Sequence, residues 1–320
     1  MVYTVTLNPA LDYVAETNRF EIGATNRTVK DAVRVGGKGI NVSVVLHRLA
    51  VPTRAIAFIG GYVGNAVREM TEKCGIDARF IPCEGCTRIN VKLKVQQPVS
   101  PLSEQATSEF FPSETELNGV GVIAGEKEIA LLREELTALN RGDWLVLSGS
   151  VPRGVPADIY AVLARDASAR GARVVVDATG ELLKNALNAR PFLVKPNLLE
   201  LGELFGTVIR DESSAQNYAE RLLAMGAENV VVSMGASGAF LLTHDQNLYR
   251  VLPPQGKIID TVGAGDSLVA GFIAEYENTR SYRNALTFGV AAGSATAFSE
   301  WLAEKSLVER VYSELIARVM

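Results

Sequence analysis

The sequence predicts an α/β fold in which helices cover both faces of a mostly parallel β-sheet, with a smaller β-sheet beside it. The first observation is that short apolar segments alternate with amphipathic ones through the middle of the chain. Strands are expected at 144–147, 173–176, 192–194 and 230–233, and helices near 126–139, 156–170, 198–205 and 214–225. Such alternation is typical of parallel strands joined by crossover helices.

The N-terminal part of the chain continues this pattern. Residues 2–7 and 55–59 are apolar segments that end at Asn8-Pro9 and Gly60-Gly61, so both are expected to be buried strands. Between them, apolar residues recur at i, i+3, i+4 and i+7, which predicts a helix with one buried face. These residues are Val42, Val45, Leu46 and Leu49. Further helices are expected at 65–74, 282–298 and 303–318.

The smaller sheet is predicted from residues 87–95. Apolar residues at 89, 91, 93 and 95 alternate with polar residues at 88, 90, 92 and 94, as in a strand with one exposed face. Segments 13–35 and roughly 105–118 have a similarly mixed character. We expect the lid strands to come from about 13–35 and 87–118 and to cover a bound ligand. The whole chain, residues 1–320, is then a single domain.

Composition excludes several classes of function. The 320 residues are 48% hydrophobic and 21% charged, which suits a globular domain with a substantial core. A net charge of −4 argues against a broad basic surface for nucleic acid. The chain shows neither a basic leader nor an apolar run of membrane-spanning length, so we expect a cytoplasmic protein without a membrane partner.

Cysteine and histidine are poor candidates for the chemistry. Cys83 and Cys86 have the spacing of a metal-binding pair, but there is no second pair, and His47 and His244 are distant in the sequence. Plain thiols are the favoured interpretation. Catalysis is therefore expected to depend on carboxylates and backbone dipoles.

The strongest candidate for a site is the turn at residues 260–267. It contains Gly263, Ala264 and Gly265, is followed by Asp266, and precedes apolar residues at helical spacing. A backbone with so little side chain can direct several N–H groups at an anion beside the positive end of a helix. Asp266 could accept a proton from an attacking hydroxyl. Taken alone, the turn is better explained as a helix start with a capping aspartate, and the rest of the sequence is what favours a catalytic role.

Residues 36–41 form a second glycine-rich turn before an amphipathic helix. Lys38 and Asn41 lie among its glycines, which favours contact with an anion or a sugar. Neither Gly-Lys pair in the chain is followed by Ser or Thr, so neither is a nucleotide-binding P-loop. Residues 119–124 have the spacing of a dinucleotide fingerprint but follow a segment that is a poor buried strand. In a parallel sheet, the polar turns that follow the strands are expected to meet at one edge.

Residues 36–41 and 260–266 resemble the two signatures of the phosphofructokinase-B (ribokinase-like) sugar kinases. The intervening segments come in that family's order, and the resemblance covers essentially the whole chain. It implies a ribokinase-like three-layer α/β/α sandwich with a small β-sheet lid. Residues 4–12 resemble members that act on fructose 1-phosphate or tagatose 6-phosphate, whereas residues 87–94 and 114–119 resemble the fructose 1-phosphate enzymes more.

The resemblance implies roles for individual residues on the sugar side. Asp266 matches the general base, and Gly263, Ala264 and Gly265 match the anion hole for the moving phosphoryl group. Positions that hold the sugar hydroxyls correspond to Asp12, Gly37 and Asn41. The candidates for the phosphate already on the substrate are basic, because a dianion needs several charge-assisted partners. They are Lys38, Arg88, Arg27 and Arg153, of which Arg27 and Arg153 are equally compatible with solvated surface charges.

On the nucleotide side, the resemblance implies contacts with ATP and its metal ions. The matching nucleotide positions are Lys195, Asn197, Glu200, Ser233, Gly235, Gly238 and Thr261. Glu200 also matches a residue that helps to organise Mg²⁺, through water. Asp260 corresponds to a position that ligates a monovalent cation such as K⁺ in several relatives.

The implied reaction is the ATP-dependent phosphorylation of fructose 1-phosphate to fructose 1,6-bisphosphate. The alternatives are a tagatose-6-phosphate kinase or another phosphosugar kinase, and, outside enzymes, a sensor that binds sugar phosphate without turnover. A lid with one apolar face free would allow two copies to pair as a homodimer.

Overall fold

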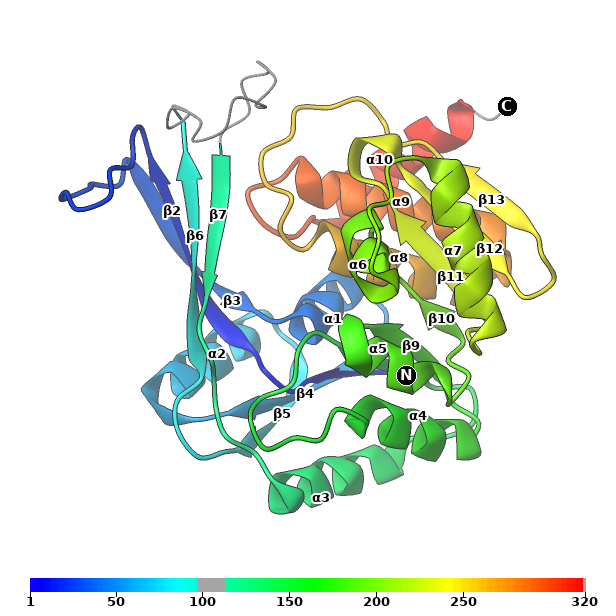
Figure 1. Ribbon diagram of the computed structural model, residues 1–320, viewed down its shortest axis with the longest axis horizontal. Coiled ribbons are helices and arrows are strands. Elements are labelled where there is room, and N and C mark those ends of the chain that lie inside the picture. The colour runs from blue at the N-terminus through cyan, green and yellow to red at the C-terminus, as the bar shows by residue number, and fades with distance from the viewer. Residues whose placement is uncertain (97–112, 319–320) are drawn as a thin grey trace.

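The computed structural model describes residues 1–96 and 113–318, and its core is a nine-stranded sheet (Figure 1). The strands are β1 (Val2–Thr6), β4 (Thr53–Ile59), β5 (Asp77–Pro82), β8 (Trp144–Ser148), β9 (Arg173–Asp177), β10 (Leu193–Val194), β11 (Asn229–Ser233), β12 (Ala239–Thr243) and β13 (Leu248–Val251). Their order is β13-β12-β11-β10-β9-β8-β1-β4-β5.

Most of this sheet is parallel. All pairs from β11 to β5 are parallel, whereas β12 pairs antiparallel with both β11 and β13 at one edge. The carboxyl ends of the parallel strands therefore lie along one side, as expected from the sequence. The sequence does not predict strands β5, β12 and β13, which the structure contains as well.

Two layers of helices enclose the sheet. One hydrophobic cluster joins it to α3 (Glu126–Glu135), α4 (Ile159–Ala169), α5 (Gly180–Leu187), α6 (Leu198–Phe205) and α7 (Glu212–Ala224). A second cluster joins the opposite face to α1 (Lys38–Arg48), α2 (Gly61–Lys73), α8 (Ala264–Thr279), α9 (Tyr282–Ala297) and α10 (Lys305–Ala317). Alternate residues of β8 enter the two clusters: Leu145 and Leu147 enter the first, Trp144 and Val146 the second. The predicted α/β/α sandwich is confirmed.

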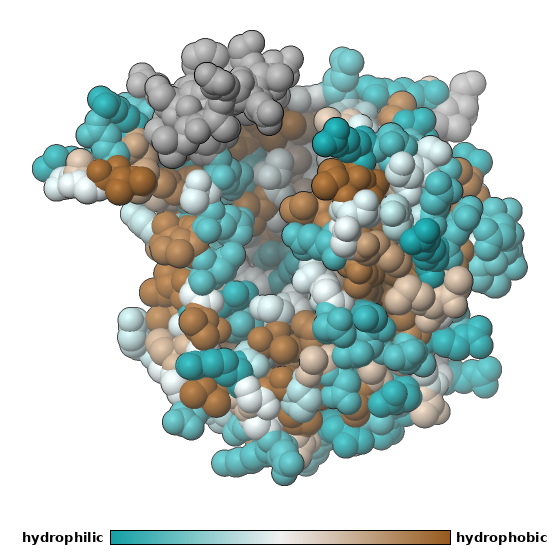
Figure 2. Space-filling view, viewed as in Figure 1, coloured by the Kyte–Doolittle hydropathy of each residue, from teal (hydrophilic) through white to brown (hydrophobic). Residues whose placement is uncertain are grey.

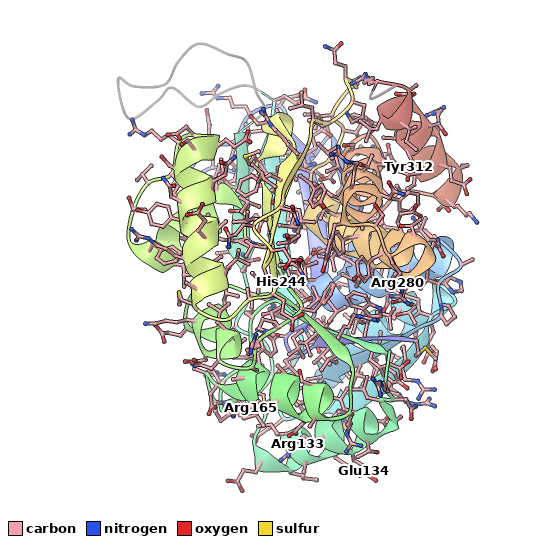
Figure 3. All side chains as sticks on the ribbon, turned by 90° about the vertical axis from the view of Figure 1, so that its right-hand side faces the viewer. Arg133, Glu134, Arg165, His244, Arg280 and Tyr312 are labelled. Atoms are coloured by element: carbon pink, nitrogen blue, oxygen red, sulfur yellow. The ribbon has the colours of Figure 1, made fainter. Side chains whose placement is uncertain are left out.

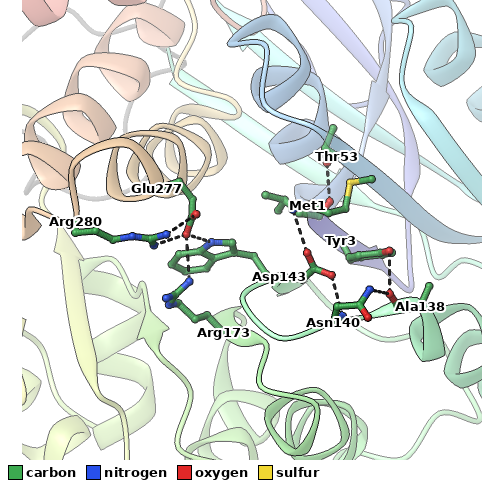
Figure 4. Close-up of polar contacts among 11 residues, drawn as sticks. Met1, Tyr3, Thr53, Ala138, Asn140, Asp143, Arg173, Glu277 and Arg280 are labelled. Atoms are coloured by element: carbon green, nitrogen blue, oxygen red, sulfur yellow. Dashed lines mark hydrogen bonds and ion pairs between the residues drawn. The ribbon is translucent and has the colours of Figure 1, made fainter.

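The edge of the sheet opposite the polar turns is tied to α8 by one carboxylate. Glu277 accepts a hydrogen bond from the indole N–H of Trp144 at 2.8 Å and forms ion pairs with Arg173 and Arg280 (Figure 4). These contacts fix the C-terminal half of α8 against β8 and β9. The N-terminal end of α8, where the glycine-rich turn lies, is consequently held at the opposite end of the layer.

The small sheet stands apart from the main layers, at the left of Figure 1. It contains β2 (Ala10–Thr17), β3 (Lys30–Gly36), β6 (Arg88–Val95) and β7 (Ser113–Asn118), in the order β3-β2-β6-β7. The structure contains the small sheet that the sequence predicts, while residues 105–112 lie outside the described part of the chain. Among residues 1–96 and 113–318, no helix has the length and apolar character needed to cross a membrane.

Candidate active site

A cleft of about 840 Å³ lies between the small sheet and the carboxyl edge of the large one. Figure 2 shows it as a hollow between the lid and the body of the molecule. Most of the predicted site residues line it: Asp12, Gly37, Lys38, Asn41, Arg88, Lys195, Asn197, Glu200, Ser233, Thr261, Gly263, Gly265 and Asp266. Residues distant in sequence therefore share one cavity.

Asp266 lies in the first turn of α8, at the wall of this cleft. Gly263 caps the helix in the left-handed conformation, with φ of 79°. The side chain of Asp266 is only 6% exposed and accepts a 2.8 Å hydrogen bond from the amide of Asn41. Burial and the nearby Asp177 carboxylate raise the pKa of Asp266 to about 6, although Lys38 and Asn41 oppose the shift. A carboxylate with this pKa can act as a general base near neutral pH.

The turn before Asp266 can bind an anion. The N–H of Ala264 donates to the carbonyl of Thr261 at 3.2 Å, and the N–H of Ser267 donates to the carbonyl of Gly263. In the described part of the chain, the N–H groups of Gly265 and Asp266 have no such backbone acceptor. Both groups lie at the positive end of α8, where an anion is stabilised.

Neighbouring groups come close to the backbone in both turns. A methyl group at Gly36 would lie 2.5 Å from the Asp12 carboxyl, and one at Gly265 would lie 3.1 Å from Nζ of Lys195. Gly37 has φ of 131°, which L-residues rarely adopt. The bare backbone at these turns therefore leaves room for the functional side chains themselves.

Asp177 connects the two lysines of the site. Its Oδ1 lies 3.1 Å from Nζ of Lys38 and 3.4 Å from Nζ of Lys195, and Lys38 also lies 3.4 Å from Glu200. Burial opposes ionisation of Asp177, but Lys195 and Lys38 outweigh it and lower its pKa. Burial likewise opposes the charge on Lys38, yet Asp177, Glu200 and Asp266 raise the pKa of Lys38. Lys38 is therefore held in its charged form, and together with Lys195 it places two basic side chains close to the glycine-rich turn.

Several polar atoms of the cleft have no partner within the described residues. Five buried side-chain oxygens lack a hydrogen bond there, and four of them belong to residues that line the cleft. These four are Asn8 Oδ1, Asn41 Oδ1, Ser148 Oγ and Asp177 Oδ2. Because a buried polar group without a partner is costly, this concentration indicates a site that is completed by a polar ligand.

The inner face of the lid contributes a charged and amide-rich wall. Asp12 accepts a 2.9 Å hydrogen bond from Asn90 and lies 3.6 Å from Nζ of Lys92, which also pairs with Glu116. Burial raises the pKa of Asp12, while Lys92 and Asn90 oppose the rise. Arg88 donates from Nε to the carbonyl of Asn8, which leaves its terminal nitrogens available at the cleft. A sugar hydroxyl and an anionic group can both be held here.

The opposite wall is built on α6 and the end of β11. The side chain of Asn197 caps α6 by accepting a 2.8 Å hydrogen bond from the backbone N–H of Glu200. The side chain of Glu200 in turn accepts a 2.9 Å hydrogen bond from the backbone N–H of Asn197. This capping box fixes the Glu200 side chain at the cleft. Ser233 ends β11 and also lines the cavity. Gly235 and Gly238 follow in a short 3₁₀ turn with φ of 56° and 85°.

Six predicted residues are not among those that line the cleft: Arg27, Arg153, Gly235, Gly238, Asp260 and Ala264. Arg27 and Arg153 are exposed, and neither is among the residues that line the cavity, so their interpretation as surface charges is favoured. Asp260 is buried, but its carboxylate is already paired with Arg34 and Lys94. Ala264 lies between two lining glycines.

Sequence reasoning missed Asp177 and the polar residues of the lid. Asp177 directly follows an apolar strand at the carboxyl edge, which is a signal that could have found it. The alternation at 87–95 predicts an exposed face for Asn90 and Lys92, but that face lines the cleft. His244 is 59% exposed and lies on the side turned away from the lid (Figure 3), and neither it nor His47 is among the residues that line the cleft.

Comparison with known proteins identifies the family. Residues 6–305 match the model of the pfkB family carbohydrate kinases. The chain is 40% identical over 315 residues to a 1-phosphofructokinase of Bacillus subtilis, covering 98% of each protein. It is 32% identical over 318 residues to a D-tagatose-1-phosphate kinase of Bacillus licheniformis, again covering 98% of each.

Solved structures give the same result. The phosphofructokinase-2 of Escherichia coli in complex with substrates and products superposes with a TM-score of 0.87, at 30% identity, over 98% of this chain and 99% of that one. The same enzyme is known in complex with potassium, with a TM-score of 0.86, and in a tetrameric inhibited form. The match to the family model across nearly the entire sequence means that this chain belongs to the pfkB family of carbohydrate kinases.

Proposed function

We propose that this kinase transfers the γ-phosphoryl group of ATP to the C6 hydroxyl of fructose 1-phosphate, giving fructose 1,6-bisphosphate. The observation that carries the proposal is the buried Asp266 carboxylate, which lies in the cleft beside unpaired N–H groups of α8 and two lysines. Relatives named 1-phosphofructokinase, among them the Bacillus subtilis protein, support the choice of substrate.

Asp266 is the proposed general base. Its carboxylate accepts the proton of the attacking hydroxyl, and the hydrogen bond from Asn41 fixes the orientation of the carboxylate. The N–H groups of the turn at residues 263–265 stabilise negative charge on the transferring group. Because phosphoryl transfer requires mainly positioning and charge stabilisation, this arrangement provides the two elements that the reaction needs.

The basic residues divide into two groups. Lys38 contacts Asp177 and Glu200, so we assign it to the transferring phosphoryl group. This revises the sequence-based choice of Lys38 for the phosphate already on the sugar. Arg88 and Lys92, on the lid side, are the candidates for that phosphate. Asp12, Gly37 and Asn41 are left for the sugar hydroxyls.

The nucleotide is assigned to the wall formed by Lys195, Asn197, Ser233 and Thr261, with Gly235 and Gly238 in the loop beside it. In the described residues, no cluster of three or more His, Cys, Asp or Glu side chains could hold a metal ion alone. This fits Mg²⁺, which usually binds through one or two carboxylates, waters and substrate phosphates. Glu200 would hold it through water, and bound Mg²⁺ would neutralise charge on the phosphates.

A coupled assay tests the proposal. Release of ADP with fructose 1-phosphate, ATP and Mg²⁺ is the expected result. Fructose 6-phosphate and tagatose 6-phosphate serve as comparison substrates. Binding of sugar phosphate without ADP release at any Mg²⁺ concentration would favour a sensor instead.

A second substrate is favoured by one relative. The D-tagatose-1-phosphate kinase of Bacillus licheniformis matches over nearly its whole length. Tagatose 1-phosphate differs from fructose 1-phosphate only in configuration at C4, so the same lid residues could hold its phosphate. The ratio of kcat/KM for the two ketose 1-phosphates decides between them.

The outer face of the lid supports pairing of two chains as a homodimer. Strand register puts Val33, Ile89 and Leu117 on the face opposite the cleft, where they are 49%, 41% and 71% exposed. An apolar surface of this kind typically marks an interface between proteins. Sedimentation should give a mass near twice 34.4 kDa, and Leu117→Lys should shift it toward the monomer.

A further inference from the structure

Asp260 directly precedes the glycine-rich turn and is held on both oxygens by the lid. Its Oδ2 accepts a 2.8 Å hydrogen bond from Nη1 of Arg34, on β3. Its Oδ1 lies 3.1 Å from Nζ of Lys94, on β6, and accepts the N–H of Val262 at 3.1 Å. One carboxylate therefore joins two lid strands to the backbone of the turn.

This cluster is largely buried, and its three side chains line a small pocket of about 80 Å³. Asp260 is 5% exposed, and the side chains of Arg34 and Lys94 are 17% and 18% exposed. The backbone N–H of Asp260 donates to the carbonyl of Ala297, at the end of α9. Since a buried carboxylate without a counter-charge is strongly destabilising, at least one cation must stay beside Asp260.

These contacts do not fit a monovalent cation on the Asp260 carboxylate. Such an ion would need at least one carboxylate oxygen, and each oxygen already has a cationic partner within hydrogen-bond or ion-pair distance. A third positive charge at this position would also be repelled by the other two. The contacts of Asp260 therefore argue against the monovalent cation that the resemblance places there.

We propose that Arg34 and Lys94 are positioning residues that take the place of a monovalent cation and hold the glycine-rich turn in its anion-binding conformation. They act through Asp260, whose Oδ1 fixes the N–H of Val262, one residue before Gly263. Because both cations belong to the lid, the conformation of the turn is also linked to the position of the lid. This inference rests on the phosphoryl transfer proposed above.

The primary experiment compares the unmodified enzyme in K⁺ and in tetramethylammonium, an organic cation too large for such a site, at matched ionic strength. We expect kcat and the thermal unfolding midpoint to be the same in both salts. A kcat that rises severalfold in K⁺, or a midpoint that K⁺ raises specifically, would overturn the inference. Absence of ADP release in every salt would instead count against the kinase function, and the unfolding midpoint would still test the cation site.

Variants then test the two side chains. The Arg34→Ala/Lys94→Ala enzyme has space beside Asp260, and we expect a loss of kcat of about tenfold from misplacement of the turn. K⁺ should restore most of it and raise the unfolding midpoint, whereas tetramethylammonium should do neither. The Arg34→Met/Lys94→Met enzyme loses the same charges, but its methionine side chains fill the space beside Asp260. We therefore expect the same loss of kcat, and K⁺ should not restore it.

Lys30 provides the matched control. It is another lid lysine that pairs across to the main body, but its contact with Glu300 is exposed. Lys30→Ala should leave kcat unchanged and insensitive to K⁺. Wild-type kcat in the double alanine variant, or a loss that K⁺ does not restore, would contradict the assignment of Arg34 and Lys94.

Discussion

The amide of Asn41 donates a 2.8 Å hydrogen bond to the carboxylate of Asp266, although 225 positions separate the two residues. Asn41 lies in the first turn of α1 and Asp266 in the first turn of α8, and these two helices pack together on the same face of the sheet. The contact therefore joins the two glycine-rich turns into one site. It also orients the carboxylate toward the cleft, which a general base requires.

Replacing Asp266 by Asn should reduce kcat by about a hundredfold or more, because the amide cannot accept the hydroxyl proton. KM should change less, since the side chain keeps its size and an oxygen that can accept from Asn41. Steady-state ADP release measures both constants. Asp211→Asn is the control, since Asp211 also lies at a helix N-terminus but caps α7 outside the cleft. Near-normal kcat in Asp266→Asn would refute the role of the base.

The pH dependence of kcat/KM should follow the ionisation of Asp266. Burial and Asp177 raise its pKa to about 6 in the free enzyme, and only the ionised form accepts a proton. We expect kcat/KM to rise as pH increases through about 6 and then to level off. The measurement is a series of initial rates between pH 5 and 8 at low sugar phosphate. A flat profile across this range would mean that another group limits the reaction.

Lys38→Met should lower kcat by between ten- and a hundredfold, because it removes a charge next to the anion-binding turn. The acid limb of the pH profile should also move to higher pH, since Lys38 lowers the pKa of Asp266 and its loss lets that pKa rise. Lys73→Met, at an exposed lysine near the end of α2, is the control and should change neither. A lower kcat with an unchanged pH profile would mean that Lys38 does not influence the ionisation of Asp266.

Much of the fold could be predicted because local pattern and final environment agree. The strands at 144–147 and 173–176 are apolar apart from Arg173, and as β8 and β9 they are buried on both faces except at that residue. Edge elements were harder to predict. In β5, Ile81 is buried while Asp77 is exposed, and such a mixed sequence carries little signal. The helix expected at 65–74 begins at Gly61 in the structure, because Gly60-Gly61 ends a strand and also starts α2.

The site was predictable where its residues lie in turns with unusual backbone requirements. Gly36 and Gly265 are such positions, and both lie beside functional side chains. Ion-pair partners were not predictable, since Asp177 meets Lys38 and Lys195 only through the order of strands in the sheet. The same limit applies to Asp260. Its sequence context matches a cation ligand, but its charge partners come from strands far away in the chain.

Gly36→Ala should raise KM for the sugar phosphate by severalfold while the protein remains folded. The added methyl group would lie 2.5 Å from the Asp12 carboxyl, so Asp12 has to shift from the cleft wall. Since sugar hydroxyls are proposed to bind there, the loss should be larger for the sugar than for ATP. Gly125→Ala is the control, because its methyl group meets only Glu128, at 3.9 Å. An unchanged KM in Gly36→Ala would exclude Asp12 from the sugar site.

The raised pKa of Asp266 should also cost stability at neutral pH. The pKa rises from 3.8 to about 6 on folding, so the folded protein binds more protons between these values. The stabilising contribution is full below 3.8 and is lost as pH rises through about 6. Asp266→Asn should therefore be more stable than the unmodified protein at pH 8, by at most about 3 kcal/mol.

Denaturant unfolding at several pH values checks this difference, which should narrow as pH falls from 6 toward 4. Asp211 offers a comparison of opposite sign, because hydrogen bonds from Ser214 lower its pKa. Its charged form stabilises the folded state above its unfolded pKa, so Asp211→Asn should not gain stability at pH 8. Equal unfolding free energies for Asp266→Asn and the unmodified protein at pH 8 would mean that the Asp266 carboxylate is not strained. In that case, burying the Asp266 carboxylate in the cleft would not lower the free energy of unfolding.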